Sequence, residues 1–308
     1  MTDDERRQSK LEGRAQFERL QMRAFWDEML GVLQQKPVHL LSFDEVKHKL
    51  HLRDQVYRGL QEIPLDAIVG SVGRYKDFTA HFLPRNPQMM DRWSNVYAQI
   101  QGMTGVPPIE VYKVGEVYFV RDGNHRVSIR RGMGDTHIEA YVWEIHTAVP
   151  LSPGMTQNEL DAASSYADFL QITRLDVSRP TTAPIKLTEP ERYRDVLEHI
   201  GLVQQSMSTQ YETQVHVEDA AVRWYDTVYR PAIELIRKYK ILEMFPKRTE
   251  ADLYTWIISH LQELTNEFHD DHASLSEALV QMLAKNKIPV PKQLLMEQDD
   301  EPILLGGE

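Results

Sequence analysis

The residues of this chain that are best suited to chemistry are five consecutive ones, Asp122-Gly123-Asn124-His125-Arg126. They follow the apolar run VYFV and precede the run VSIRRG, which has the character of a short helix. The first backbone N–H groups of a helix have no partner within it, and the helix dipole favours negative charge there. Glycine lets the backbone approach a ligand closely, and arginine can hold a phosphate through two parallel hydrogen bonds. The segment therefore predicts a loop that binds an anionic group such as a phosphate.

The side chains of this loop indicate separate roles. Gly123, Asn124 and His125 would present hydrogen-bond donors to the phosphate, and Arg126 would be the main countercharge. Asp122 could hold a divalent ion, cap the helix or orient His125, so Asp122 and His125 are the catalytic candidates. A simpler interpretation is that Asp122 only caps a helix and Arg126 is a solvated side chain, because short loop motifs also occur without function. The residue types alone leave both interpretations open.

A second glycine-rich loop, GSVGRY, occupies residues 70–75. Ser71 and Arg74 could contact the same ligand from the opposite wall of a cleft. The alternative is a tight turn that carries a surface arginine, because two glycines alone do not make a phosphate loop. Arg130 lies four residues after Arg126 and would share its helix face, where it could extend the positive field over a phosphate or remain solvated.

Two further groups of polar residues are open to more than one interpretation. Glu110 and Glu116 flank the predicted hairpin and could supply a general base, but nothing in the sequence chooses between them and Asp122. The run HDDH at 269–272 could bind a divalent ion or simply end a helix. No metal ligand is assigned.

The elements that must position these loops can be read from the hydrophobic periodicity. An amphipathic helix is expected over 5–34, and a second helix begins near Ser42, with Glu45 completing a capping box. Gly115-Glu116 is expected to form a two-residue hairpin turn. The remaining expectations are strands at 63–69, 107–114, 117–122 and 136–145, and helices at 86–102 and from the DGNHR loop to Gly132.

The segment from about residue 60 to 146 resembles the core of the ParB/sulfiredoxin superfamily. The similar features are the DGNHR loop, the hairpin before it, the helix and strand after it, and the upstream stretch IPLDAIVGSVGRYKDF at 63–78. Members of this superfamily include sulfiredoxins, CTP-binding partition proteins and free-serine kinases, and their equivalent loop binds nucleotide phosphates. The resemblance implies an α+β fold, a small mixed sheet with helices, that binds a nucleotide (ATP or CTP) together with Mg²⁺.

The loop departs from each branch of that superfamily. Sulfiredoxins carry Gly-Cys-His-Arg, and here Asn124 replaces the reactive cysteine, which excludes sulfiredoxin chemistry. Partition proteins carry Gly-Glu-Arg-Arg and a later Glu-Asn motif, and neither is intact here. Serine kinases carry Asp-Gly-His-Thr-Arg, to which Asp122 and Gly123 are similar. The resemblance therefore implies nucleotide or phosphoester binding more firmly than it implies any one reaction.

Three segments are expected: N-terminal helices over 1–58, the ParB/sulfiredoxin-like domain over 59–148 and an all-α C-terminal domain over 149–308. Within the last, Pro231 should kink or break a helix near 217–240. The stretches 221–242 and 245–261 resemble a bacterial domain of unknown function. Their aromatic residues recur at helical spacing, which favours core packing over a ligand cage.

Composition limits the partners. The net charge is −11, and acidic residues outnumber basic ones only after residue 150, so a protein partner of the helical half is favoured over DNA. The chain has no cysteine, which excludes disulfides, thiolate metal sites and cysteine nucleophiles. The sequence contains no membrane-length apolar stretch and no signal-peptide core, so we expect a cytoplasmic protein. The sequence leaves its oligomeric state open, with a homodimer as one option.

Two classes of function follow from these features. The first is a nucleotide-binding enzyme, a small-molecule kinase or a nucleotide hydrolase. The second is a non-catalytic regulatory or partition-like module that binds a protein or DNA. Both classes require that the DGNHR loop binds a phosphate group.

Overall fold

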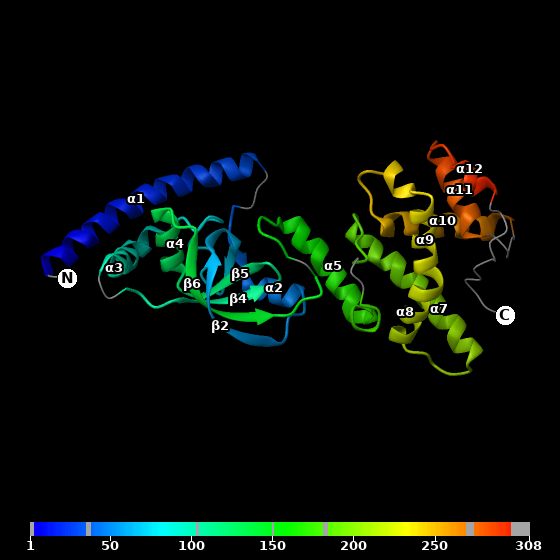
Figure 1. Ribbon diagram of the computed structural model, residues 1–308, viewed down its shortest axis with the longest axis horizontal. Helices are drawn as coiled ribbons and strands as arrows, with labels where there is room; N and C mark the ends of the chain where they lie inside the picture. Colours follow the sequence, from blue (N-terminus) through cyan, green and yellow to red (C-terminus); the bar gives the residue numbers. More distant parts are fainter. Residues whose placement is uncertain are drawn as a thin grey trace. The chain divides into compact units, whose positions relative to one another are not determined.

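The computed structural model describes residues 3–34, 38–102, 105–149, 151–180, 184–268 and 274–296. The chain divides into two compact units, Met1–Ser164 and Ser165–Glu308 (Figure 1). The segments expected from the sequence were divided differently, at 58/59 and 148/149. The first of those positions falls inside a strand, and the long N-terminal helix belongs to the first unit.

The first unit is built on a six-stranded mixed sheet, in the order β1-β3-β5-β4-β6-β2. Neighbouring strands are parallel in the pairs β1/β3, β3/β5 and β4/β6 and antiparallel in β4/β5 and β2/β6. The expectation of a mixed sheet combined with helices is therefore confirmed. The strands are β1 (Leu41–Ser42), β2 (Gln55–Pro64), β3 (Ile68–Ser71), β4 (Ile109–Val114), β5 (Val117–Asp122) and β6 (His137–Ile145).

Helices cover both faces of this sheet. Val111, Val120 and Val142 are fully buried in one core with residues of three helices: α1 (Asp3–Leu33), α3 (Met90–Gln101) and α4 (Asn124–Met133). On the other face, α2 (Phe43–Lys49) stacks Phe43 on Tyr112, with ring centroids 4.5 Å apart. The sheet is thus held between two helical layers, and α4 enters its layer directly from the end of β5.

The long helix α1 lies along α3 (Figure 1). Its inward face is apolar, and Phe17 meets the Trp93 ring edge-on at 5.7 Å between centroids. Arg14 pairs with Asp91 at 2.6 Å beside this contact. Burial of Phe17, Leu20 and Ala24 therefore fixes α1 on α3 and joins it to the first unit.

The hairpin and helix around the DGNHR loop agree with the sequence analysis. Val114 pairs with Val117 across the two-residue turn, and Gly115 adopts a φ of 60°, which glycine tolerates without strain. Helix α4 ends at Gly134, whose φ of 88° again requires the left-handed region. These local signals predicted the elements correctly.

One predicted strand was wrong. Residues 63–69 do not form a single strand: Ile63 and Pro64 end β2, a 3-10 turn spans Leu65–Ala67, and β3 begins at Ile68. The two flanking strands lie at different places in the sheet, β2 at one edge and β3 next to β5. The turn at Leu65–Ala67 lets the chain leave one strand position and start another.

The second unit is helical among its described residues. The π-helical turn Tyr225–Tyr229 connects α8 to α9 in one continuous helical run, and Pro231 is the second residue of α9. The expected kink or break at Pro231 is replaced by the π-helical turn just before it, and the helical run continues. The helices are α6 (Leu175–Ser178), α7 (Tyr193–Gln210), α8 (Val217–Trp224), α9 (Arg230–Lys238), α10 (Glu250–Phe268), α11 (Leu275–Lys285) and α12 (Lys292–Met296), preceded by α5 (Gln157–Thr173), which begins in the first unit.

The core of the second unit contains a polar chain of buried aromatic side chains. The Trp224 indole donates to the Tyr254 hydroxyl at 2.8 Å, and that hydroxyl lies 3.0 Å from Nδ1 of His199. Because Tyr254 already accepts from Trp224, its own hydrogen is free to be donated to His199. Trp224, Tyr229 and Tyr254 are core residues, as the aromatic spacing predicted, whereas Tyr225 and Trp256 are only partly buried.

None of the helices within the described ranges is long and apolar enough to cross a bilayer. The HDDH run at 269–272 and the C-terminal residues 297–308 lie outside the described residues.

Candidate anion-binding site

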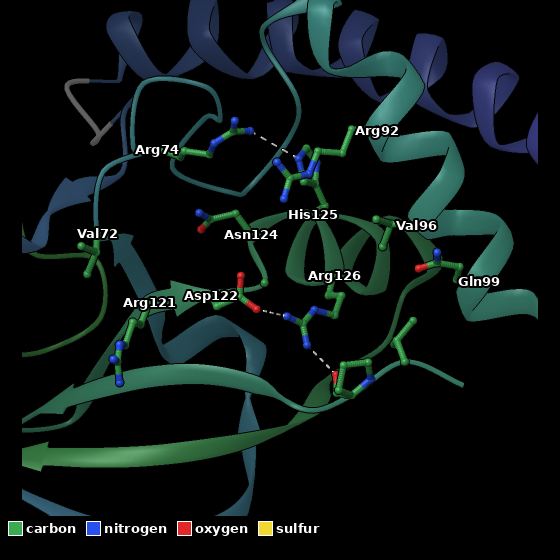
Figure 2. A pocket seen from close by; sticks show the side chains of 13 residues that line it. Val72, Arg74, Arg92, Val96, Gln99, Arg121, Asp122, Asn124, His125 and Arg126 are labelled. Atoms are coloured by element: carbon green, nitrogen blue, oxygen red, sulfur yellow. Dashed lines mark hydrogen bonds and ion pairs between the residues drawn. The ribbon is translucent and has the colours of Figure 1, made fainter. Parts of the chain in front are cut away.

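A cavity of about 440 Å³ opens at the turn between β5 and α4, in the size range of small-molecule sites (Figure 2). It lies wholly within the first unit and is lined by the DGNHR loop and by residues of the loop after β3, of α3 and of the segment before β4. Its lining residues are Val72, Arg74, Arg92, Val96, Gln99, Val106, Pro107, Arg121, Asp122, Gly123, Asn124, His125 and Arg126.

The turn into α4 requires glycine at position 123. Gly123 has a φ of 112° and a ψ of 20°, in the left-handed region. A Cβ at this position would also lie 2.5 Å from Cγ2 of Ile109. Both the backbone conformation and the space around it therefore exclude a side chain.

The start of α4 has no side-chain cap. Gly123 is the N-cap residue, and its carbonyl accepts the first helical hydrogen bond from the Val127 N–H at 3.0 Å. Asp122 therefore does not cap the helix, which removes the simplest interpretation of that residue. The N–H groups of Asn124, His125 and Arg126 precede the first intrahelical bond and face the region of the cavity with the positive end of the helix dipole.

His125 is buried in the cavity wall with one unused ring nitrogen. Only 7% of the residue is exposed, and its ring packs edge-on against Phe78. Burial, reinforced by the charges of Arg92 and Arg74, lowers the pKa of His125 to about 4. The imidazole is therefore neutral at neutral pH.

The neighbours of His125 indicate which nitrogen carries its proton. Nη1 of Arg74 lies 3.5 Å from Nε2, and arginine can only donate, so Nε2 accepts and the proton resides on Nδ1. Nδ1 is buried and has no hydrogen-bond partner within the described residues. A buried N–H without an acceptor is costly, and an oxygen of a bound anion would satisfy it.

Asn124 has a similar unsatisfied group. The residue is 8% exposed, and Oδ1 is buried with no partner among the described atoms. Its side chain projects from the first turn of α4 (Figure 2). Because the amide also carries two N–H donors, Asn124 can donate to a phosphate while its oxygen accepts from a hydroxyl of the same ligand.

Arginines dominate the charge of the cavity wall. Arg74, Arg92, Arg121 and Arg126 line it, against one acidic residue, Asp122. A positive cavity in a chain with a net charge of −11 focuses anions at this place. The arrangement favours a multiply charged anionic ligand.

The four arginines differ in how far they are already engaged. Arg92 extends from α3, is exposed, and has no hydrogen bond or ion pair within the described residues. Arg74 is half-exposed and lies 3.8 Å from Asp77. Arg121 lies over the Trp143 ring at 5.1 Å. Arg92 and Arg74 are therefore the cations most available to a ligand.

Arg126 has a different role from the one expected. It is 12% exposed at its side chain and pairs with Asp122 across one helical turn. Its Nη1 also donates to the carbonyls of Pro107 and Pro108, at 2.5 and 2.7 Å. Arg126 thus braces the loop against the chain that leads into β4, and it is not a free countercharge for a ligand.

The second predicted loop contributes only one of its two candidates. Arg74 lines the cavity and reaches His125. Ser71 is fully buried in β3, and its hydroxyl donates to the Val120 carbonyl at 3.2 Å. Ser71 therefore joins two strands of the sheet and lies away from the cavity wall.

The other polar candidates are engaged in the fold. Arg130 pairs with Asp135 at 3.1 Å, and Glu110 lies 3.6 Å from Arg121. Arg131 donates to the backbone carbonyls of Leu65 and Ile68. Across the described ranges, no group of three or more His, Asp or Glu side chains could hold a metal ion.

Sequence reasoning missed Arg92, Gln99 and Arg121 as lining residues. Arg92 and Gln99 belong to a helix more than twenty residues before the loop, and only the packing of α3 on α4 brings them to it. Arg121 directly precedes Asp122. Its position next to the DGNHR loop was the one signal in the sequence that could have identified it.

No protein-family model matches this chain, and neither does any curated protein.

Proposed function

We propose that this protein binds a nucleotide, or another phosphoester, in the cavity at the β5–α4 turn. The observation that carries the proposal is the buried Nδ1 of His125, which has no hydrogen-bond partner among the described residues; His125 lies at an uncapped helix N-terminus, in the wall of a cavity that four arginines line. The three kinds of donor are complementary to the charge and the several acceptor oxygens of a phosphate.

The arrangement of strands and helices around the loop supports a more specific proposal about the fold. The hairpin β4–β5, the glycine turn, α4 and the return strand β6 follow one another as they do in the ParB/sulfiredoxin superfamily. We infer that residues about 60–146 belong to that superfamily, and that ATP or CTP is the ligand class.

Magnesium would accompany a triphosphate, but the wall is poorly suited to hold it directly. Asp122 is the one acidic residue in the lining that the structure describes, and it already forms an ion pair with Arg126. Mg²⁺ keeps several waters and is often held mainly by substrate phosphates. Phosphate oxygens and waters would therefore be most of the ligands of Mg²⁺. Asp122 would be available as a ligand only if it separates from Arg126.

The same geometry favours binding over proton abstraction. A histidine with a pKa near 4 is a weak base, and the proton on Nδ1 makes it a donor toward the ligand. Asp122 would have to leave Arg126 to act as a base. A kinase or hydrolase activity therefore requires a rearrangement of this pair, whereas a regulatory, nucleotide-binding module requires none.

Calorimetric titration with ATP, ADP, CTP and GTP tests the proposal. We expect saturable binding of at least one nucleotide, weakened by added salt because the contacts are ionic. Failure of all four to bind at millimolar concentration would refute nucleotide binding.

Turnover separates the two classes of function. Release of phosphate, or transfer to free serine or a related hydroxyl metabolite, would identify an enzyme. Binding without turnover identifies the regulatory module, and a salt-sensitive DNA mobility shift would then distinguish a DNA partner from a protein partner.

A further inference from the structure

Helix α1 presents a second apolar face that no described residue of the first unit covers. Its inward face is buried on α3, yet eight large apolar residues on the same helix are 46–76% exposed. They are Leu11, Met22, Phe25, Trp26, Met29, Leu30, Val32 and Leu33. Isolated exposed apolar residues are ordinary, but eight on one helix are not.

The exposed face has the spacing of a coiled-coil seam. With Ala15 at position a of a heptad, the a and d positions from 11 to 32 are Leu11, Ala15, Glu18, Met22, Phe25, Met29 and Val32. All but Glu18 are apolar, and all seven are exposed. Trp26 and Leu33 flank this seam at position e. A pattern sustained over three heptads is the one that pairs with another helix.

The area of this face matches what a stable dimer needs. Each large apolar side chain exposed by about half contributes roughly 100 Å², so the eight together offer on the order of 800 Å². That is about the area that each partner buries in a standard interface, and it exceeds the largest apolar patch of most monomers, about 300–600 Å². We propose that α1 pairs with α1 of a second copy of this chain, through the seam from Leu11 to Val32.

The charges on α1 indicate an antiparallel pair. In a parallel pair, Glu18 would face Glu18 of the partner subunit, and Arg14 would lie beside Arg19 of the partner subunit. An antiparallel pair separates these like charges. The antiparallel register that matches every seam residue from Ala15 to Val32 places Met22 opposite Phe25 of the partner subunit.

Light scattering of the full chain tests the dimer. The wild type should have twice the chain mass of 35.8 kDa. The double substitution Phe25→Glu and Met29→Glu should reduce the mass to that of a single chain, because it would place charged carboxylates in the apolar seam between the two helices. Both positions are exposed, so the circular dichroism spectrum should remain that of the wild type. Val177→Glu, at an exposed apolar residue of α6, is the matched control and should remain dimeric.

The chain has no cysteine, so introduced cysteines report the orientation. A mixture of Met22→Cys and Phe25→Cys chains should form more disulfide-linked dimer than either variant alone. Two results would overturn the proposal: a wild type of single mass throughout the micromolar range, or a Phe25→Glu and Met29→Glu variant that keeps the double mass. Stronger linking of each cysteine variant with itself would overturn the antiparallel arrangement.

Discussion

Removal of the Arg92 charge should weaken ligand binding without weakening the fold. Arg92 has no hydrogen bond or ion pair within the described residues, so Arg92→Met should change the free energy of unfolding by less than about 0.5 kcal/mol. A guanidinium about 4 Å from a phosphate charge interacts by roughly 4 kcal/mol at an effective dielectric constant of 20. Exposure of Arg92 to solvent reduces this to about 1–2 kcal/mol, which is a 5- to 30-fold increase in Kd.

The matched control for this variant is Arg130→Met. Arg130 lies on α4, pairs with Asp135 outside the cavity, and carries the same charge. Calorimetry at low and physiological salt should show a Kd within about twofold of wild type for Arg130→Met, with the loss for Arg92→Met shrinking as salt rises. Equal losses for the two variants, or an unchanged Kd for Arg92→Met, would refute the assignment of Arg92 to the ligand.

Three further predictions concern the loop and the buried histidines. Arg126→Met should lower the free energy of unfolding of the first unit by about 2 kcal/mol, because three hydrogen bonds are lost, and a wild-type denaturation midpoint would contradict the bracing role. Gly123→Ala should cost more than Gly134→Ala in the same assay, since both strain a positive φ, about 1–2 kcal/mol, but only the Cβ at 123 would collide with a neighbour. Acid should destabilise the protein through His125 and His199, because burial lowers the pKa of each to about 4 in the folded chain. The unfolded chain takes up these protons near pH 6.5, whereas the folded chain does not. Stability that is present above pH 6.5 is therefore lost as the pH falls to 4. Each histidine contributes about 3 kcal/mol to this loss, and denaturant titrations of His199→Gln should show a flatter pH dependence than wild type.

The elements nearest the loop could be predicted because their signals are local. The turn Gly115-Glu116, the glycine at 123 and the apolar runs of β4 and β5 each indicate their own conformation. Strand β2 was expected only at its end, because its sequence QVYRGLQEIP is exposed along most of its length and lacks a buried alternating face. An edge strand of this kind is specified by its partner β6 more than by its own residues.

The composition of the cavity was predictable only in part. Gly123, Asn124 and His125 follow from a motif in one continuous segment. The engagement of Arg126 could not be foreseen, because its acceptors are backbone carbonyls of Pro107 and Pro108, which no side-chain pattern reveals. Arg92 comes from another helix, and its place depends on tertiary packing.

The burial of Ser71 has the same kind of cause. The sequence places Ser71 in a glycine-rich loop, where a hydroxyl is usually available. The structure instead extends β3 through Ser71 and pairs it with Val120 of β5, which turns the hydroxyl toward a sheet carbonyl. The residue at which a strand ends therefore depends on its pairing with the neighbouring strand, here β5.

A crystal structure of the protein soaked with a mixture of nucleotides tests the central claim most directly. We predict phosphate oxygens within hydrogen-bond distance of the backbone N–H groups of residues 124–126 and of Nδ1 of His125, with the Arg92 guanidinium turned toward them. A nucleotide bound elsewhere on the chain, or a His125 Nδ1 that donates to a protein atom in the filled crystal, would contradict the account.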